Sequence, residues 1–411
     1  MTHVSIRRSW RAVALAAVVS LGVAACGNSG NDSSSGDSGG ELTIGASLPL
    51  TGDFSEPGKA AKEGYEVWQA MINADGGLLG KQVKLIIKDD ASNQNTIVSD
   101  YNALISQDNV DLLLGTFSSL LNLPASSVAE KNRMLYVEPA GGSPDMFNRG
   151  YQYLFFAQQA TADKQGLPFA DWVKNLPADQ RPKTAAYPTL DDPFAAPNVD
   201  GIRQVLEGAG IKTVYKTTYA IDTKNFDSIV AAMKSANPDL VVHGATFEDG
   251  VGVTRAMLKS GWTPKMFYET STPSFADQYV KAIGEENTEG VMYAVSYSPE
   301  ADTPLNDEFV AQYKKMFGSD IPPEDAADAF AAAQVMQAAV EAVGSISDQA
   351  KLADWLHANK VNTILGDLSW DDTGAPQGEF LIGQWINGTA EIVLPEDVAT
   401  AKAEVGWHPG S

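Results

Sequence analysis

Ser118 and Ser119 stand where side chains often bind a small anion, between an apolar run and an amphipathic segment. The run 111–115 predicts a strand and 119–131 predicts a helix, so the two serines open that helix. Backbone N–H groups at a helix start have no partner within the helix. A hydroxyl there can cap the helix or help to bind a carboxylate, at about 1.5–3 kcal/mol per hydrogen bond to the charged group. The pattern leaves both alternatives open.

Ala140, Gly141 and Gly142 follow the next apolar run, 134–137. Glycines after a strand let the backbone approach a ligand closely, and a simple turn would use them equally well. Ligands of parallel sheets bind outside the carboxyl ends of the strands, where helix N-termini converge. The two loops, 118–119 and 140–142, are therefore the candidate site for a small ligand.

Residues for covalent or metal chemistry are scarce. Cys26 is the only cysteine, and the four histidines are far apart in the sequence. This composition nearly excludes a zinc site of histidine and cysteine and a Cys–His catalytic pair. Adjacent acids such as Asp191 and Asp192 do not generally converge on one bond, and no pairing of a nucleophile with a base is recognisable. We expect a protein that is not an enzyme, with no catalytic residue, metal or cofactor.

Short apolar runs alternate with longer amphipathic runs from residue 41 onward. The first set predicts strands at 42–46, 83–87, 111–115 and 134–137, separated by helices at 59–73, 94–106 and 119–131. The second set predicts strands at 184–187, 213–219, 240–243 and 265–268, with helices at 163–175, 198–209, 225–236 and 249–260. Short apolar strands between helices are typical of parallel sheets covered on both faces. Two such sheets predict a ligand cleft between them that closes by a hinge.

The C-terminal part of the chain predicts one further helix and several strands. Residues 326–343 are rich in alanine, but acids and amides interrupt them, so they predict an amphipathic helix and not a membrane span. Strand-like runs follow at 364–370, 380–385 and 391–394.

The first forty residues have the layout of an export signal. Three arginines precede the apolar run 12–25, which is shorter than the roughly 20 residues that span a bilayer. The segment ending at Cys26 resembles the lipobox of bacterial lipoproteins, although Val23 stands where such boxes usually carry leucine. We expect removal of 1–25 and lipidation of Cys26; an ordinary cleaved signal is the alternative. The polar segment 26–40 predicts a flexible tether.

Composition limits the class of partner. The formal net charge of −23 repels phosphate backbones and argues against a nucleic-acid partner. Without the signal the chain is long enough for two domains of ordinary size, and its hydrophobic content of 44% suffices for two cores.

Seven segments agree in order and spacing with one known family: 44–52, 72–81, 88–90, 115–119, 139–144, 149–151 and 365–371. They resemble type I periplasmic binding proteins, and specifically the branched-chain amino-acid (Leu/Ile/Val) binding family of ABC importers. The resemblance implies an α/β fold of two interleaved Rossmann-like lobes with parallel central sheets, joined by three crossover segments. Lobe 1 would comprise 41–158 plus 297–370, and lobe 2 would comprise 159–294 plus 376–411.

The resemblance also implies ligand contacts in the first lobe. In the family, the residue that matches Ser119 binds the carboxylate of an amino acid. The residue that matches Gly142 is usually a threonine, so the backbone contact can persist here while the hydroxyl contact cannot. Phe54, in the loop 53–58, is expected at the rim of the cleft.

In the second lobe the resemblance points to Phe194, Phe247 and Thr270. Family members commonly have tyrosines at the first two positions and, at the third, a glutamate that pairs with the ligand ammonium. Glu269 is one residue away, and neighbours on a strand face opposite sides, so which of the two faces the cleft stays open. Other acids that could take the place of the glutamate are Asp192, Asp249 and Asp325.

Together these features predict an extracytoplasmic solute-binding lipoprotein of an ABC importer, anchored to the outer face of the bacterial cell membrane through Cys26. The ligand is expected to be small and to bear a carboxylate, with leucine, isoleucine and valine as the family default. The departures at Gly142, Phe194, Phe247 and Thr270 favour something less polar, so an aromatic or aliphatic acid or a short amide is the alternative. The expected partners are permease and ATPase subunits, with the chain a monomer. A sensor that signals to another protein is a second alternative.

Overall fold

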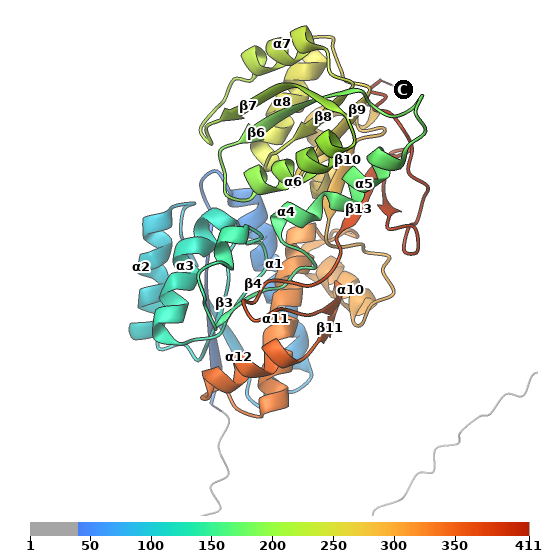
Figure 1. The fold of residues 1–411 in the computed structure, drawn as a ribbon. Coiled ribbons are helices and arrows are strands. Elements are labelled where there is room, and N and C mark those ends of the chain that lie inside the picture. The colour runs from blue at the N-terminus through green and yellow to red at the C-terminus, as the bar shows by residue number, and fades with distance from the viewer. Residues whose placement is uncertain (1–39, 411) are drawn as a thin grey trace, which may run out of the picture. The chain divides into compact units, whose positions relative to one another are not determined.

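The computed structural model describes residues 40–410. The signal 1–25, the predicted lipidation site Cys26 and the tether up to residue 39 lie outside this range. The described residues contain a five-stranded sheet, a seven-stranded sheet and a short two-stranded hairpin (Figure 1). The predicted α/β fold class with parallel central sheets is confirmed.

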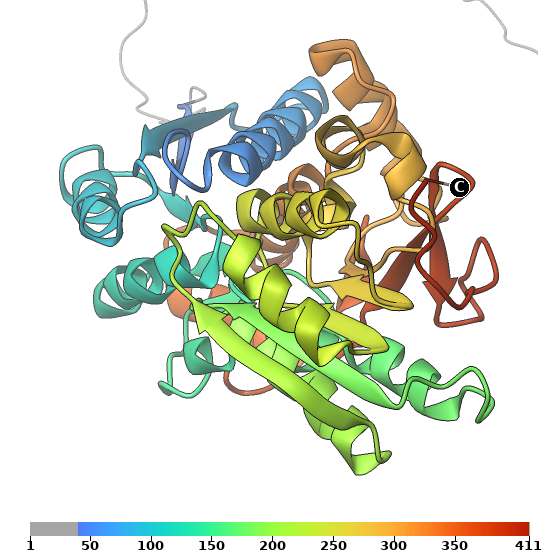
Figure 2. The same ribbon diagram turned by 90° about the horizontal axis from the view of Figure 1, so that it is seen from above.

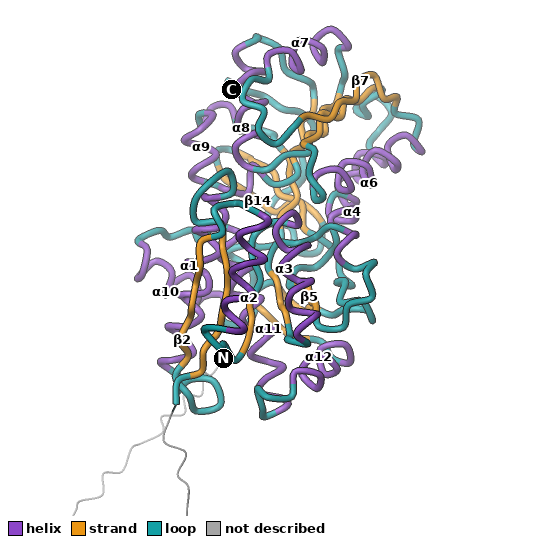
Figure 3. Tube along the Cα trace, turned by 90° about the vertical axis from the view of Figure 1, so that its left-hand side faces the viewer, coloured by secondary structure: helices purple, strands orange, loops and turns teal. Residues whose placement is uncertain are grey.

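The five-stranded sheet is parallel throughout, in the order β2-β1-β3-β4-β5. Its strands are β1 (Leu42–Leu48), β2 (Val83–Asp89), β3 (Leu112–Leu114), β4 (Tyr136–Glu138) and β5 (Leu154–Phe156). Helices α2 (Gln94–Ser106) and α3 (Ser119–Asn132) pack on one face, and α1 (Ser55–Ala74), α10 (Asn306–Phe317), α11 (Glu324–Val343) and α12 (Gln349–Ala358) cover the other. Figure 3 shows these strands between their helices. We call this sheet with its helices the first lobe.

Helices α1 and α11 pack side by side although they come from opposite ends of the chain. A Cβ atom on Gly64 would lie 2.0 Å from the carbonyl oxygen of Ala326, so glycine is needed for this close approach. The helix predicted at 326–343 begins two residues earlier, which places Glu324 and Asp325 in its first turn, where the helix dipole favours acids. Within 40–410, no helix is both long enough and apolar enough to cross a membrane.

The seven-stranded sheet has the order β14-β13-β10-β9-β8-β6-β7. Its strands are β6 (Thr184–Leu190), β7 (Lys212–Tyr219), β8 (Leu240–His243), β9 (Met266–Glu269), β10 (Met292–Val295), β13 (Leu381–Ile386) and β14 (Thr389–Leu394). One face is covered by α5 (Leu167–Asn175) and α6 (Ala195–Gly208), the other by α7 (Asp227–Ala236), α8 (Phe247–Lys259) and α9 (Asp277–Ile283) (Figure 2). The short helix α4 (Ala162–Gln165) precedes α5. We call this sheet with its helices the second lobe.

Some elements differ from the sequence prediction. Strands β13 and β14 add an antiparallel edge to the parallel strands, joined at Asn387 and Gly388, whose φ angles of 51° and 76° suit a two-residue hairpin turn. The helix expected at 163–175 is divided at Gly166, because Pro168 lacks the N–H that would continue it and lies instead in the first turn of α5. The strand expected at 364–370 is a hairpin of β11 (Val361–Thr363) and β12 (Gly366–Leu368).

The chain passes between the two sheets three times: between β5 and α4, between β10 and α10, and between β12 and β13. Gln159, in the first connection, donates from Nε2 to the carbonyl oxygen of Ser296 in the second at 2.7 Å. The carbonyl oxygen of Gln159 accepts from the N–H of Gly378 in the third connection at 2.8 Å. One residue therefore ties the three connections together, while the predicted lobe boundaries stay predictions.

Candidate functional site

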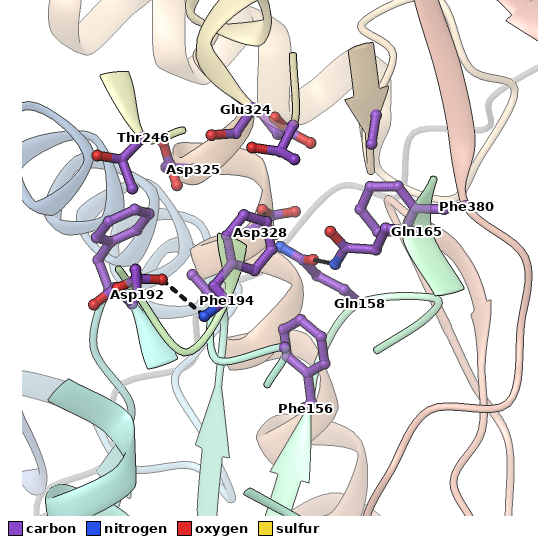
Figure 4. Close-up of a pocket in the computed structure, with 17 residues that line it drawn as sticks. Phe156, Gln158, Gln165, Asp192, Phe194, Thr246, Glu324, Asp325, Asp328 and Phe380 are labelled. Carbon is purple, nitrogen blue, oxygen red and sulfur yellow. Dashed lines mark hydrogen bonds between the residues drawn. The ribbon is translucent and has the colours of Figure 1, made fainter. Parts of the chain in front are cut away.

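A cavity of about 60 Å³ lies at the carboxyl ends of strands from both sheets (Figure 4). Its first-lobe wall comes from the loops after β3 and β4, the end of β5 with the residues that follow, and the first two turns of α11. Its second-lobe wall comes from α4, β10, the loops after β6, β8 and β9, and Phe380 directly before β13. This is the place where parallel α/β sheets bind ligands. The lining residues are Phe117, Ser118, Ala140, Gly142, Phe156, Gln158, Gln165, Asp192, Phe194, Thr246, Thr270, Ser271, Ala294, Glu324, Asp325, Asp328 and Phe380.

Ser118 lines the cavity directly before α3. Its backbone has φ 73° and ψ 159°, a region that favours glycine, and its Oγ is buried without a hydrogen-bond partner in the described part of the chain. Ser119 is buried beside it and does not line the cavity; its Oγ accepts from the N–H of Ser143 at 3.0 Å. The two adjacent hydroxyls therefore have different surroundings.

The loop after β4 is hydrogen-bonded to the carboxylate of Glu138, a buried residue of the protein itself. Oε2 of the buried Glu138 accepts from the N–H of Ala140 at 2.9 Å and from Nδ2 of Asn122 at 3.1 Å. Burial raises the pKa of Glu138 well above its usual value, although the N–H groups of Ala140 and Gly141 oppose the shift. Ala140 and Gly142 line the cavity, whereas Gly141 lies over the Glu138 carboxylate.

In the second lobe, Thr270 faces the cavity and Glu269 faces away from it. Oγ1 of Thr270 is hydrogen-bonded to both backbone groups of Ala245, at 2.9 Å to the N–H and 2.7 Å to the carbonyl oxygen. The Glu269 carboxylate is fully buried on the other side of β9, with Oε1 2.9 Å from Nδ1 of His243. Neighbouring residues on a strand point to opposite sides, which accounts for the division.

Three predicted residues of the site lie elsewhere or have other contacts. Phe247 packs against Phe275, with ring centroids 4.8 Å apart, and Phe54 packs edge-on against Phe117 at 5.7 Å; neither lines the cavity. Asp249 accepts at Oδ2 from the hydroxyl of Tyr219 at 2.5 Å. Among the predicted contacts, those in the wall are Ser118, Ala140, Gly142, Phe194 and Thr270, and those outside it are Ser119, Gly141, Phe247 and Phe54.

Four acids line the cavity, and two of them, Asp192 and Asp325, had been considered from the sequence. Oδ1 of Asp192 accepts from the N–H groups of Phe194 and Ala195 at 2.7 and 3.3 Å, whereas its Oδ2 is buried without a partner in the described chain. Burial raises the pKa of Asp192 above its usual value. One oxygen of this carboxylate is therefore hydrogen-bonded, and the other is available to a ligand.

The other three acids lie on the first two turns of α11. Oε1 of Glu324 lies 2.9 Å and Oδ1 of Asp328 lies 2.5 Å from the same hydroxyl oxygen, Oγ of Ser296. That hydroxyl has one hydrogen, so two close carboxylate contacts require a further proton on one of the acids. Burial raises the pKa of both acids, and the charge of Glu324 adds to the rise at Asp328.

Asp325 differs from its two neighbours on the helix. Within the described chain, no hydrogen bond from another residue reaches its carboxylate, which lines the cavity. Burial and then the charge of Glu324 raise its pKa well above the usual value. In the sequence, Glu324, Asp325 and Asp328 are spaced so that they lie on one side of an alanine-rich helix. This spacing indicates a shared helix face, but it does not indicate that the face lines a cavity.

No lysine, arginine or histidine is among the lining residues, all of which belong to 40–410. Across the same range, no group of three or more histidine, cysteine, aspartate or glutamate side chains is arranged to hold a metal ion. No basic side chain of the described wall therefore offsets the charge of the four acids.

Comparison with known proteins assigns the family. Residues 41–390 match the family model described as periplasmic binding protein. The chain is 27% identical to the Leu/Ile/Val-binding protein homolog 3 of Brucella melitensis over 352 residues, which are 85% of this chain and 92% of the relative. It is 25% identical to the Leu/Ile/Val-binding protein of Escherichia coli K12, over 83% of this chain and 90% of the relative.

Solved structures show the same fold. A leucine binding protein of Thermotoga maritima superposes with a TM-score of 0.76 at 21% identity, covering 87% of this chain and all 100% of the other. An ABC transporter solute binding protein of R. palustris in complex with benzoate gives a TM-score of 0.73 at 20% identity, over 90% and 99% of the two chains. At these identities the likeness is one of fold.

Proposed function

The chain belongs to the periplasmic binding protein family, and from this premise we propose that it is the extracytoplasmic solute-binding lipoprotein of an ABC importer. The observation that carries the proposal is the cavity whose wall is shared by the two lobes. A ligand that contacts both walls binds the closed arrangement more tightly than an open one and shifts the population toward it. The protein would capture and release its ligand unchanged.

The ligand in this proposal is a small molecule with an apolar part, in the class of branched-chain or other hydrophobic amino acids. The relatives named for leucine, isoleucine and valine support this class. Four phenylalanines would receive the apolar part, and the free Oγ of Ser118 at the start of α3 is a donor for a carboxylate. The lining phenylalanines are Phe117, Phe156, Phe194 and Phe380.

An aromatic or aliphatic acid without an amine is less well supported as the ligand. The fold neighbour in complex with benzoate makes this the natural alternative. Here, however, the cavity wall contains four acids and no basic side chain, so a lone carboxylate would meet like charge without compensation.

The membrane and transport roles are part of the same proposal. Cys26 would carry the lipid that holds the protein at the outer face of the cell membrane, and 26–40 would be its tether. Permease and ATPase subunits would be its partners, and the chain would act as a monomer. Labelling with a radioactive fatty acid tests the anchor: we expect label on the wild type and none on Cys26→Ala.

The binding function is tested by a thermal-shift screen of the full-length chain against amino acids, amines, acids and amides. The best compound is then followed by small-angle X-ray scattering. We expect it to raise Tm and to reduce the radius of gyration, because binding favours the closed lobes. A chain that no small molecule both stabilises and compacts would contradict the proposal. Uptake of the compound by cells with and without the gene tests delivery.

A further inference from the structure

The chemistry of the ligand can be taken one step further, on the basis of the proposed function. We propose that the ligand carries a protonated nitrogen group, as in an amine, an amidine or a guanidine, and that Asp192 and Asp325 bind this group from opposite lobes. The substrate class is then small organic cations with an apolar body, and a carboxylate on the ligand is not required.

The cavity has more acid than the protein itself neutralises. Its wall contains four carboxyl groups and no basic side chain. Two independent polar atoms are also left without partners in the described chain, Oδ2 of Asp192 and Oγ of Ser118, and each residue is only 4% exposed. Buried polar groups are nearly always hydrogen-bonded, so unsatisfied atoms in a cavity wall indicate the place of a missing partner. Both atoms can accept a hydrogen bond, as an N–H donor requires.

Two of the four acids already have neutral partners. The hydroxyl of Ser296 lies between Glu324 and Asp328, donating to one and accepting from the protonated form of the other, and Nε2 of Gln158 donates to Oδ2 of Asp328 at 2.6 Å. Asp325, by contrast, is 9% exposed, and its carboxylate accepts no hydrogen bond from another of the described residues. Asp192 and Asp325 are therefore the acids that remain for a ligand.

The position of the two free acids suits a ligand that closes the lobes. Asp192 follows β6 in the second lobe, and Asp325 lies in the first turn of α11 in the first lobe. Figure 4 shows both side chains at the same cavity. A cation bound to both would pair charges that otherwise repel, which gives it the preference for the closed form that a transport ligand needs.

Two of the donors expected for a ligand carboxylate are not available in the cavity. The N–H of Ala140 donates to Glu138, and the hydroxyl of Ser119, whose oxygen accepts from the N–H of Ser143, does not line the cavity. These were the groups from which the sequence predicted a carboxylate site. Since the protein supplies its own carboxylate at this loop, a ligand does not have to bring one.

The remaining wall and the surface charge fit the same class. The negative face of an aromatic ring attracts a cation within about 6 Å, and four phenylalanines line the cavity, so the rings would receive the apolar body and the edge of the cationic group. The net charge of −23 would also raise the local concentration of cations at the mouth of the cavity.

Ionisation of the acids supports the assignment. Burial raises the pKa of Asp192, and burial with the charge of Glu324 raises that of Asp325. A bound cation favours the ionised form and offsets the desolvation that raises both pKa values. Binding of the cation is therefore expected to release protons, and affinity should increase as the pH rises.

The test compares ligands of one shape and three charges. Thermal shifts and titration calorimetry of the full-length chain are measured with benzamidine, benzamide and benzoate, and across a panel of small alkyl and aryl amines, amidines and guanidines. We expect cations to raise Tm and to bind at least tenfold more tightly than the neutral or anionic compound of the same shape. Equal or tighter binding of benzamide or benzoate, or no stabilisation by any cation of the panel, would overturn the inference.

Substitutions locate the binding group. Asp325→Asn and Asp192→Asn keep size and hydrogen bonding but remove the charge, and each is expected to weaken cation binding at least tenfold. Asp354→Asn, an exposed acid on α12, is the matched control and should bind as the wild type does. Because Asn at these positions removes buried like charge, far-UV circular dichroism and an unchanged or higher Tm would show that the variants fold. Unchanged cation affinity in both pocket variants would also overturn the inference.

The outcomes separate this inference from the proposed function. If benzoate or an aliphatic acid without an amine stabilises and compacts the chain while amines do not, the solute-binding function stands and the cationic ligand class is wrong. If no compound of any charge compacts the chain, the solute-binding function itself fails.

Discussion

Nε2 of Gln158 donates to Oδ2 of Asp328 at 2.6 Å, which joins the first connection between the lobes to the helix that carries three of the four cavity acids. The same Nε2 donates to the carbonyl oxygen of Pro139 at 2.9 Å, and Oε1 of Gln158 accepts from Gln165 of α4 at 3.3 Å. The side chain of Gln158 thus joins an acid of the cavity to the first connection between the lobes and to α4.

Asp328→Asn is expected to stabilise the ligand-free chain near neutral pH by about 1–2 kcal/mol, because it removes one of several buried like charges while its amide can keep hydrogen bonds to Gln158 and Ser296. Urea unfolding of the full-length chain measures the change. Asp354→Asn, with the same loss of charge at an exposed position, should be neutral. A lower free energy of unfolding for Asp328→Asn at neutral pH would contradict the account.

The same substitution should alter the pH dependence. Burial raises the pKa values of Asp192, Glu324, Asp325 and Asp328 above their unfolded values of 3.8 for aspartate and 4.5 for glutamate. The folded chain therefore binds more protons than the unfolded chain does. The contribution of these groups to the free energy of unfolding is fully present below the unfolded pKa and is lost as the pH rises through the folded pKa. Asp328→Asn should reduce this loss of stability with rising pH. If the free energy of unfolding, measured in urea, changed with pH to the same extent in the wild type and in Asp328→Asn, the prediction would be wrong.

His243 is expected to act in the opposite direction. Burial lowers its pKa from 6.5 to about 4, so its contribution is present above pH 6.5 and is lost as the pH falls toward 4. Its Nδ1 lies 2.9 Å from Oε1 of Glu269 and its Nε2 lies 2.7 Å from the hydroxyl of Tyr219. His243→Ala should cost about 3 kcal/mol near neutral pH, because both buried partners lose a hydrogen bond, and less in acid. A constant cost over this range in urea unfolding would refute the explanation.

Ser118 provides a test of backbone strain. Its φ of 73° and ψ of 159° lie in a region that costs a residue with a Cβ atom about 1–3 kcal/mol. Ser118→Gly should therefore raise the free energy of unfolding by about 1 kcal/mol, after allowance for the greater entropy of the unfolded glycine chain. Ser118→Ala removes the same hydroxyl without relieving the strain, so it should not stabilise. Equal stabilities of the two variants would show that strain is not the cause.

Ser119→Ala distinguishes a ligand contact from an internal one. Because Oγ of Ser119 accepts from the N–H of Ser143, its removal leaves a buried donor unpaired and should cost about 1–3 kcal/mol of stability. Cation binding should change less than twofold. A loss of cation affinity of about tenfold, which corresponds to one charge-assisted hydrogen bond, would instead place this hydroxyl against the ligand.

Much of the fold could be predicted because local pattern and tertiary structure agree. The helix predicted at 94–106 is α2 with the same bounds, and β1, β2 and β8 begin at the predicted residues. Strands β5 and β10 were not predicted, since three or four apolar residues beside a connection do not differ from a buried loop in sequence. Their assignment depends on pairing with distant strands, which a local pattern does not contain.

The site was less accessible to sequence reasoning than the fold. The loops with Ser118 and Gly142 could be found because they follow predicted strands, and Phe194 was indicated by the family resemblance. The burial of Asp325 could not be predicted, because an acid in the first turn of a helix is ordinarily solvated, whereas here it is 9% exposed in the wall of a cavity. The resemblance pointed to a carboxylate site, while the internal contact of Glu138 with Ala140 becomes visible only in three dimensions.

The most direct test of the account is titration calorimetry of the full-length chain with two analogues of leucine. Isopentylamine is leucine without its carboxylate, and isocaproate is leucine without its amine. The account predicts that isopentylamine binds, that its affinity rises with pH, and that Asp325→Asn weakens it at least tenfold. Binding of isocaproate with no binding of isopentylamine would contradict it.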